Sequence, residues 1–322
     1  MAKGREIVDV CGVESLTYNF RPMLPQDTKD KLIELFVAID DFCLALRAWQ
    51  TSRQLGEEPL EKPGSQLSYS EQMTILVFYH YSGYKCFEYY YRQVVQTELR
   101  SYFPRLISYE RFVVTITRVL PGLFLFLQYR CRCSQQTGTY FVDSKKLPVC
   151  DNRRIHSHRV FADIAARGKT STGWFFGLKV HLVINQLGEI VSFLLTPGNV
   201  ADNNHQVLHC LLDHLKGHCI GDKGYLTTLF EHFYERGLQL ITRIRTKMKN
   251  QLMPLDHKLK LRKRALIESV NDILMSVFDI DHTRHRNPYN AICHTLSGLI
   301  AYCFYPNKPS VFIPRMDGCL AA

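Results

Sequence analysis

The hydrophobic pattern of this chain changes near residue 137, and this change limits the fold more than any other feature. Before it, apolar residues recur at intervals of three and four, as in residues 28–49, which predicts amphipathic helices. After it, the short continuous apolar run 140–142 and longer runs such as 174–184 are typical of strands. The chain is therefore expected to combine a helical region with an α/β region.

The α/β region is expected to span residues 137–305 and to contain a mixed sheet of five strands with helices on its faces. Its elements follow the order strand, hairpin, helix, strand, helix, strand, helix, with the hairpin turn at residues 185–188. Asp202 stands where a helix would begin, which predicts an N-cap. The last helix is expected to run unbroken over about residues 258–277, and residues 306–322 would form a C-terminal tail.

Residues 1–130 are expected to form a helical region of their own. Ser68 and Glu71 have the spacing of a capping box, and the polar residues 51–66 before them predict a loop. Short helices joined by glycine-containing turns are typical of a helix-turn-helix module that binds DNA. The tyrosines and the arginine of residues 89–92 face DNA in one interpretation and pack inside the region in the other.

The distribution of charge points to a polyanionic partner. The chain has 40 lysines and arginines against 30 aspartates and glutamates, a net charge of +10. Residues 241–290 alone hold eleven basic and five acidic residues, and a second basic stretch runs from residue 145 to residue 169. Such clusters favour DNA as the partner, although two solvated charged faces would have the same composition.

The sequence also predicts where the protein resides. Its eleven cysteines are scattered, and no apolar N-terminal stretch with a small-residue cleavage site precedes them, so a reducing cytoplasm is expected. The longest apolar run, residues 291–305, is shorter than the roughly 20 residues that a membrane span needs. This run is expected to form a buried helix, and no membrane partner is expected.

Three acidic residues stand where their side chains can converge. Asp143 ends the first strand of the α/β region, Asp222 ends the fourth, and Glu268 lies on the last helix. Ligands tend to bind at the carboxyl edge of neighbouring strands, so the three carboxylates can share one space. Carboxylates this close repel each other unless cations lie between them, and their oxygens suit Mg²⁺ or Mn²⁺. We therefore predict that these three residues are catalytic metal ligands, because two such ions can drive in-line displacement at phosphorus.

Residues 137–305 resemble the RNase H-like core of the DDE transposases of bacterial insertion sequences, which belong to the retroviral integrase superfamily. Four stretches carry the resemblance: residues 141–144, 196–202, 221–225 and 264–271. It implies metal-dependent cleavage of DNA at transposon ends and strand transfer to target DNA, with two Mg²⁺ or Mn²⁺ ions. It also implies that the partners are terminal inverted repeats and target DNA, bound by a homo-oligomer associated with the nucleoid.

Such transposases commonly carry a Y-x2-R-x3-E-x6-K signature around the catalytic glutamate. Arg264 and Glu268 match it, whereas Leu261 stands in place of the tyrosine and Met275 in place of the lysine. One helical turn separates Arg264 from Glu268, which puts both on one face, where Arg264 can hold a phosphate. The contacts that the missing tyrosine and lysine would make must come from elsewhere or are lost.

The segment 281–286 resembles a basic motif that follows the glutamate helix. In one interpretation it binds the DNA backbone, and in the other it is an exposed charged loop. Two other functions fit the same residues: an RNase H-like nuclease without strand transfer, and a transposase-derived DNA-binding protein that is no longer catalytic. The residues expected to bind DNA are Arg264, Lys145, Lys223, His282, Arg284 and Arg286.

Overall fold

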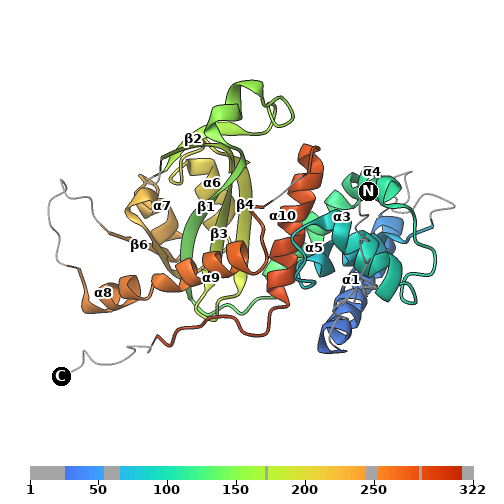
Figure 1. Cartoon of the computed structure of the whole chain (residues 1–322). Helices are drawn as coiled ribbons and strands as arrows, with labels where there is room; N and C mark the ends of the chain where they lie inside the picture. Colours follow the sequence, from blue (N-terminus) through green and yellow to red (C-terminus); the bar gives the residue numbers. More distant parts are fainter. Residues whose placement is uncertain (1–25, 54–65, 171–172, 244–252, 283–284, 314–322) are drawn as a thin grey trace, which may run out of the picture.

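The computed structural model of the chain describes residues 26–53, 66–170, 173–243, 253–282 and 285–313. In the described residues, helices come first along the chain and a curled mixed sheet with further helices follows (Figure 1). The predicted combination of a helical region with an α/β region is therefore confirmed.

The N-terminal helices pack around a shared apolar core. The predicted capping box is present, because Ser68 Oγ accepts from the Glu71 amide at 3.0 Å and Glu71 Oε2 accepts from the Ser68 amide at 2.6 Å. Tyr90 and Tyr91 are fully buried, so they pack inside the region, and most of the predicted loop 51–66 lies outside the described residues. The helices are α1 (Gln26–Ser52), α2 (Tyr69–Tyr79), α3 (Phe87–Tyr90) with the π-helical turn Tyr91–Glu98, α4 (Tyr109–Thr115), the 3₁₀ turn Ile116–Val119 and α5 (Leu120–Arg132).

The last helix of the chain, α10 (Pro288–Cys303), belongs to this helical layer. It packs against α2 and α5, and α5 also contacts β4 (Ile190–Pro197) of the sheet. Most of its residues are buried, which confirms the buried helix predicted for residues 291–305. The two ends of the described chain therefore build one helical layer together.

One helical run meets the length and composition of a membrane span. It covers Tyr109–Arg132, and just under half of its most apolar window is buried. Phe112, Leu123 and Phe126 on this run are fully buried in the apolar core shared with α1, α2 and α10. The run is therefore a core helix of the helical layer.

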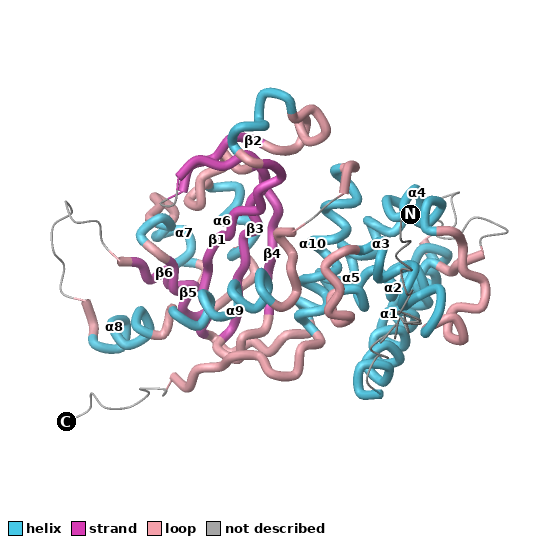
Figure 2. Tube along the Cα trace, in the orientation of Figure 1, coloured by secondary structure: helices cyan, strands magenta, loops and turns pink. Residues whose placement is uncertain are grey.

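The sheet has the strand order β2-β3-β1-β5-β6, with β4 also paired to β3 (Figure 2). The neighbours of β3 are antiparallel to it, whereas β1, β5 and β6 run parallel. The hairpin turn between β3 and β4 is confirmed: the Gly188 amide donates to the Asn185 carbonyl at 3.0 Å. The strands are β1 (Thr139–Cys150), β2 (Ala166–Thr170), β3 (Gly173–Asn185), β4 (Ile190–Pro197), β5 (Gly217–Gly221) and β6 (Leu238–Thr242).

The prediction of five strands was wrong by one, because β2 is a sixth. It pairs with the first residues of β3, and β4 pairs with the rest of β3, so β2 and β4 follow one another along one edge. The residues of β2 include Arg167 and Lys169, whose side chains lie over the Trp174 ring at 4.8 and 5.5 Å. A short charged edge strand lacks the apolar pattern by which the other strands are recognised.

Alternate residues of the central strands enter two different apolar cores. Tyr140 and Val142 face the core formed with α6 (His205–Leu212) and α7 (Phe230–Glu235). Phe141 enters the core that contains the inner side of α9 (Ala265–Ser276). Since side chains alternate along a strand, Asp143 lies on the same face as Phe141, under α9.

The unbroken final helix predicted over residues 258–277 was wrong. Two helices, α8 (Leu255–Arg262) and α9, meet at a turn where the Lys263 amide donates to the Lys260 carbonyl at 3.0 Å. Helix α8 packs on β5 and β6, whereas α9 packs on β1. The chain must change direction between these two supports, and the spacing of apolar residues does not show such a break.

Two buried histidines and one half-buried histidine join the helical layer to the segment before α10. The rings of His80 and His294 are 4.8 Å apart, and His285 lies 6.0 Å from His294. Burial lowers the pKa of all three, that of His285 to about 4. They are therefore neutral in the folded protein at pH values at which the unfolded chain already binds protons.

This difference predicts acid lability. Below pH 6.5 the unfolded state binds more protons than the folded state, so stability falls as the pH falls, by up to about 1.4 kcal/mol per histidine per pH unit. Urea unfolding at pH 7, 6 and 5 measures it, and the slope should be shallower in His285→Gln. An unfolding free energy that stays constant or rises on acidification would contradict the prediction.

Candidate functional site

Asp143 and Asp222 lie at the same level of two neighbouring parallel strands, β1 and β5. Strands β1 and β5 pair in parallel with Phe141 opposite Ile220, and each aspartate follows two residues later. Both partners of that pair enter the core under α9. The prediction that Asp143 ends its strand was wrong, because β1 continues to Cys150 and pairs Asp143 with Leu182 of β3. Asp222 follows the last residue of β5, so both aspartates lie where the pairing of β1 with β5 ends.

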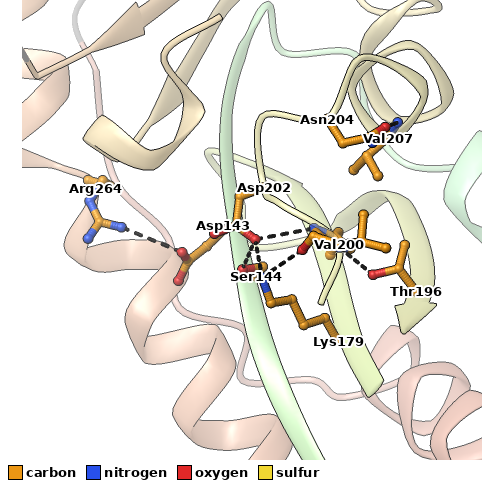
Figure 3. A network of polar contacts seen from close by, with 10 residues as sticks. Asp143, Ser144, Lys179, Thr196, Val200, Asp202, Asn204, Val207 and Arg264 are labelled. Atoms are coloured by element: carbon orange, nitrogen blue, oxygen red, sulfur yellow. Dashed lines mark hydrogen bonds and ion pairs between the residues drawn. The ribbon is translucent and has the colours of Figure 1, made fainter. Parts of the chain in front are cut away.

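The Asp143 carboxylate is contacted from α9 and from the turn before it, and Figure 3 shows the contact with Arg264 of this turn. Asn271 Nδ2 donates to Asp143 Oδ2 at 3.0 Å, and Arg264 Nη1 lies 3.9 Å from Oδ1. The side chain is 23% exposed, and its burial raises the pKa of Asp143 to about 6 although Arg264 opposes this effect. The local protein partners therefore compensate the buried negative charge only in part.

Glu268 lies on α9 one turn after Arg264. Arg264 Nη2 donates to Glu268 Oε1 at 2.7 Å, so the predicted shared face is confirmed. The glutamate side chain is 56% exposed, whereas that of Arg264 is 19% exposed. Arg264 therefore stands between Asp143 and Glu268.

Each of the three carboxylates has a protein partner of its own. Asp222 Oδ1 accepts from the Lys223 amide at 2.7 Å and caps the short 3₁₀ turn Lys223–Tyr225, while Asp143 bonds Asn271 and Glu268 bonds Arg264. Within the described residues, the sets of His, Cys, Asp and Glu whose ligand atoms all lie within 4.8 Å do not include these three acids. The three carboxylates lie near one end of the sheet, but their oxygens do not converge on a common point.

A fourth acidic residue, Asp202, is the centre of the hydrogen-bond network in Figure 3. Its Oδ1 accepts from Ser144 Oγ at 2.8 Å and from Lys179 Nζ at 3.0 Å. The prediction that Asp202 caps α6 was wrong, because Asn204 fills that position and accepts from the Val207 amide. Asp202 is thereby free to bond the residue next to Asp143.

Lys179 on β3 is almost fully buried, with 9% of its side chain exposed. Its ammonium also donates to the Val200 carbonyl at 2.9 Å. Next along the same face of β3, His181 Nδ1 lies 4.0 Å from Asp202 Oδ1, and His181 Nε2 is 2.9 Å from Thr196 Oγ1. Burial lowers the pKa of His181 to about 4, so Lys179 supplies the positive charge opposite Asp202.

A family model described as Transposase DDE domain matches residues 133–288. This region is a transposase DDE domain. The match begins just before β1 and ends at the first residue of α10, so it contains the six strands and the three predicted acids. Neither the curated proteins nor the solved structures gave a significant match to the chain. The domain implies transposase function, DNA as the partner and the use of divalent metal ions.

The loop that holds Asp202 also contacts the Asp222 loop of the DDE domain. Asn203 Nδ2 donates to the Leu226 carbonyl at 2.8 Å. Tyr225 is fully buried between the two loops, and burial, with the charges of Asp202 and Asp143, raises its pKa well above the usual value. The Asp202 loop therefore contacts both the segment of Asp143, through Ser144, and the loop of Asp222.

The two residues that depart from the family signature are packed inside the protein. Leu261 is 7% exposed and belongs to the apolar core, and Met275 packs against the same core. Apolar side chains in these places cannot contact phosphate. In this DDE domain, the contacts that the tyrosine and the lysine of the signature would make come from other positions or are lost.

The remaining residues expected to bind DNA are spread around the DDE domain. Lys145 lies 3.8 Å from Asp272 and is 39% exposed, and Lys223, His282 and Arg286 are exposed. Arg284 lies outside the described residues. Lys145 and Lys223 lie within two residues of Asp143 and Asp222 in the sequence, whereas His282 lines a cavity of about 270 Å³ beside the N-terminal helices.

Proposed function

We propose that this transposase cleaves DNA strands at the ends of its own element and joins them to target DNA, with Asp143, Asp222 and Glu268 as the catalytic carboxylates. The parallel register of β1 and β5 carries the proposal, because it sets both aspartates at one sheet edge beneath the helix of the glutamate. Ligands tend to bind at the carboxyl end of neighbouring parallel strands, and the pairing of β1 with β5 ends just before both aspartates.

The residues fit divalent cations. Burial raises the pKa of Asp143 to about 6, and a cation beside it would favour the charged form. Carboxylate oxygens are the ligands that Mg²⁺ and Mn²⁺ prefer. When bound, two such ions would polarise the scissile phosphate and stabilise the attacking and leaving oxygens. The three carboxylates would hold them, after Asp222 and Glu268 exchange their present protein partners for the ions.

Arg264 would bind a phosphate oxygen of the DNA. Its Nη1 is buried and makes no hydrogen bond with any described residue, although it lies 3.9 Å from Asp143. A buried donor without an acceptor is costly, and a phosphate oxygen next to the carboxylates would supply the acceptor. The salt bridge to Glu268 orients the guanidinium for this contact.

Asp202 would act as a positioning residue. It connects Ser144, the neighbour of Asp143, with the buried ammonium of Lys179. Its loop also contacts the loop of Asp222 through Asn203. The network would therefore hold the two aspartates at a constant separation while DNA is bound.

Substitution of Arg264 gives a graded prediction. Arg264→Lys should slow strand cleavage about tenfold or more, and Arg264→Ala should slow it further, because the planar donor pair is lost in both variants and the positive charge only in the second. Cleavage of DNA that carries the element ends measures the effect. Arg262→Ala, at an exposed position on α8, is the matched control and should keep full activity. Equal rates for Arg264→Ala and Arg262→Ala would contradict the assigned role.

The products distinguish this function from the two others that fit the acids. Purified protein, Mg²⁺, precut element ends and a target plasmid should yield ends joined covalently to the target. Cleavage without joined product would indicate a nuclease, and DNA binding without either product would indicate a non-catalytic binding protein. Bridging of two ends by a homo-oligomer in the cytoplasm belongs to the same proposal.

A further inference from the structure

Three possible ligand atoms converge between α6 and α7, away from the carboxylate site. His209 and Asp213 lie one helical turn apart at the end of α6, and His232 lies on α7. Asp213 Oδ1 is 3.1 Å from His209 Nδ1 and 3.6 Å from His232 Nε2. The ligand atoms all lie within 4.8 Å of one another.

These separations match a tetrahedral transition-metal site. Bonds of about 2.0–2.1 Å from Zn²⁺ to nitrogen or oxygen, at tetrahedral angles, put ligand atoms roughly 3.3–3.4 Å apart. The distances from Asp213 Oδ1 of 3.1 and 3.6 Å lie on either side of this value. We propose that His209 Nδ1, Asp213 Oδ1 and His232 Nε2 bind one Zn²⁺ or a similar borderline divalent ion, since two imidazoles and a carboxylate suit such ions better than Mg²⁺.

His232 supplies the observation that points to a ligand. Its Nε2 is buried and makes no hydrogen bond within the described part of the chain. Buried polar atoms without a partner are rare because each costs the free energy of a lost hydrogen bond. A cation between His232 and Asp213 would remove that cost.

A second cluster of two histidines and an aspartate in the same domain contains a cation from the protein itself. His218, Asp256 and His257 also bring their ligand atoms within 4.8 Å. There, Lys260 Nζ lies 2.6 Å from Asp256 Oδ2 and 3.3 Å from His218 Nδ1, so an ammonium occupies the place of a metal ion. Arg236 Nη2 donates to the backbone carbonyl of Asp213 at 3.3 Å, but the described residues place no lysine or arginine in ion-pair contact with the Asp213 carboxylate.

The ion would join two short helices that follow the functional loops. Helix α6 begins three residues after Asp202, and α7 begins eight residues after Asp222. Both helices cover the face of the sheet opposite α9. A bound ion would therefore stabilise the support of the catalytic site without entering it, and its stabilisation would grow with the concentration of free ion. The proposal does not depend on strand cleavage or transfer.

Cobalt provides a direct probe. The full chain is stripped of metal and kept in excess Mg²⁺, which saturates the carboxylate sites. Binding of Co²⁺ is then measured by visible absorption during a titration, and binding of Zn²⁺ is measured by calorimetry. We expect one Co²⁺ per chain with the strong visible bands of tetrahedral coordination, displaced by Zn²⁺. In His232→Gln the affinity for Zn²⁺ should fall more than about tenfold, which corresponds to about 1.4 kcal/mol. His218→Gln, the same change in the lysine-filled cluster, should bind like the original protein.

Thermal unfolding gives a second readout that does not depend on the spectrum. Zn²⁺ should raise the melting temperature of the original protein and of His218→Gln, and it should leave that of His232→Gln unchanged. Circular dichroism of the metal-free variants checks that each is folded. The proposal is overturned if the original protein binds no tetrahedral Co²⁺, or if His218→Gln loses as much affinity as His232→Gln.

Discussion

Asp143→Asn is expected to abolish DNA cleavage and, at the same time, to make the metal-free protein more stable. The loss of a carboxylate that would hold the catalytic ions should lower the cleavage rate at least about a thousandfold, since metal ions contribute several kcal/mol to such reactions. The gain in stability follows from the pKa of Asp143, which burial raises from 3.8 to about 6. An asparagine keeps the shape and an acceptor for Asn271 but removes the buried charge.

The sign of the stability effect depends on pH. Between pH 3.8 and 6 the folded protein keeps a proton on Asp143 that the unfolded chain has lost, so the contribution of Asp143 to stability falls as the pH rises and is lowest above pH 6. The shift corresponds to a cost on the order of 2–3 kcal/mol at neutral pH. Urea unfolding in EDTA should therefore show the variant to be more stable at pH 7.5 and nearly equal at pH 4. A variant less stable than the original protein at pH 7.5 would show that the carboxylate is already compensated by the protein.

Asp202→Ala is expected to destabilise the protein by about 3 kcal/mol. The substitution leaves the Lys179 ammonium buried and without its carboxylate partner, and breaking a buried ion pair on one side has costs of this order. Lys179→Met with Asp202→Ala removes both charges, so the double variant should be more stable than Asp202→Ala alone. Chemical denaturation of the two single variants and the double variant forms the cycle.

Activity separates a positioning role of Asp202 from a purely structural one. The double variant should regain most of the stability yet remain at least about tenfold slower in cleavage, because Ser144 beside Asp143 has still lost its acceptor. Asn204→Ala, which removes the cap of α6 two residues away, is the matched control and should lose about 1 kcal/mol of stability with little change in rate. Recovery of the full rate in the double variant would show that Asp202 only stabilises the fold.

The sequence allowed Asp143 and Asp222 to be placed because each ends an apolar run that could only be a buried strand. In the structure β1 and β5 are neighbours, which brings the two aspartates to the same level, but β1 continues beyond Asp143 because it stays paired with β3. Glu268 was placed by its spacing from Arg264, and the hydrogen bond between these two side chains bears out that spacing. Local patterns were sufficient here because Arg264 and Glu268 are one helical turn apart, and because Asp143 and Asp222 each follow an apolar run.

Asp202, Lys179 and the break before α9 were not predicted, because they depend on contacts distant in sequence. The bond from Ser144 to Asp202 joins residues 58 positions apart, and Asp202 itself had a local explanation as a helix cap. Lys179 lies in an apolar strand, and the sequence does not indicate which distant carboxylate its ammonium would pair with. The pair His209 and Asp213 did show the spacing of one helical turn, but His232 joins them only through the packing of α7 on the sheet.

The most direct test of the central claim is the metal preference of Asp222→Cys. If Asp222 holds a catalytic ion, a thiolate in its place should remove activity in Mg²⁺, which is a hard ion, and restore part of it in Mn²⁺, which accepts softer ligands. The measurement is the yield of element ends joined to target DNA in each metal, with the original protein active in both. Activity of Asp222→Cys in Mg²⁺ equal to that of the original protein would contradict the assignment of this aspartate and, with it, the proposed site.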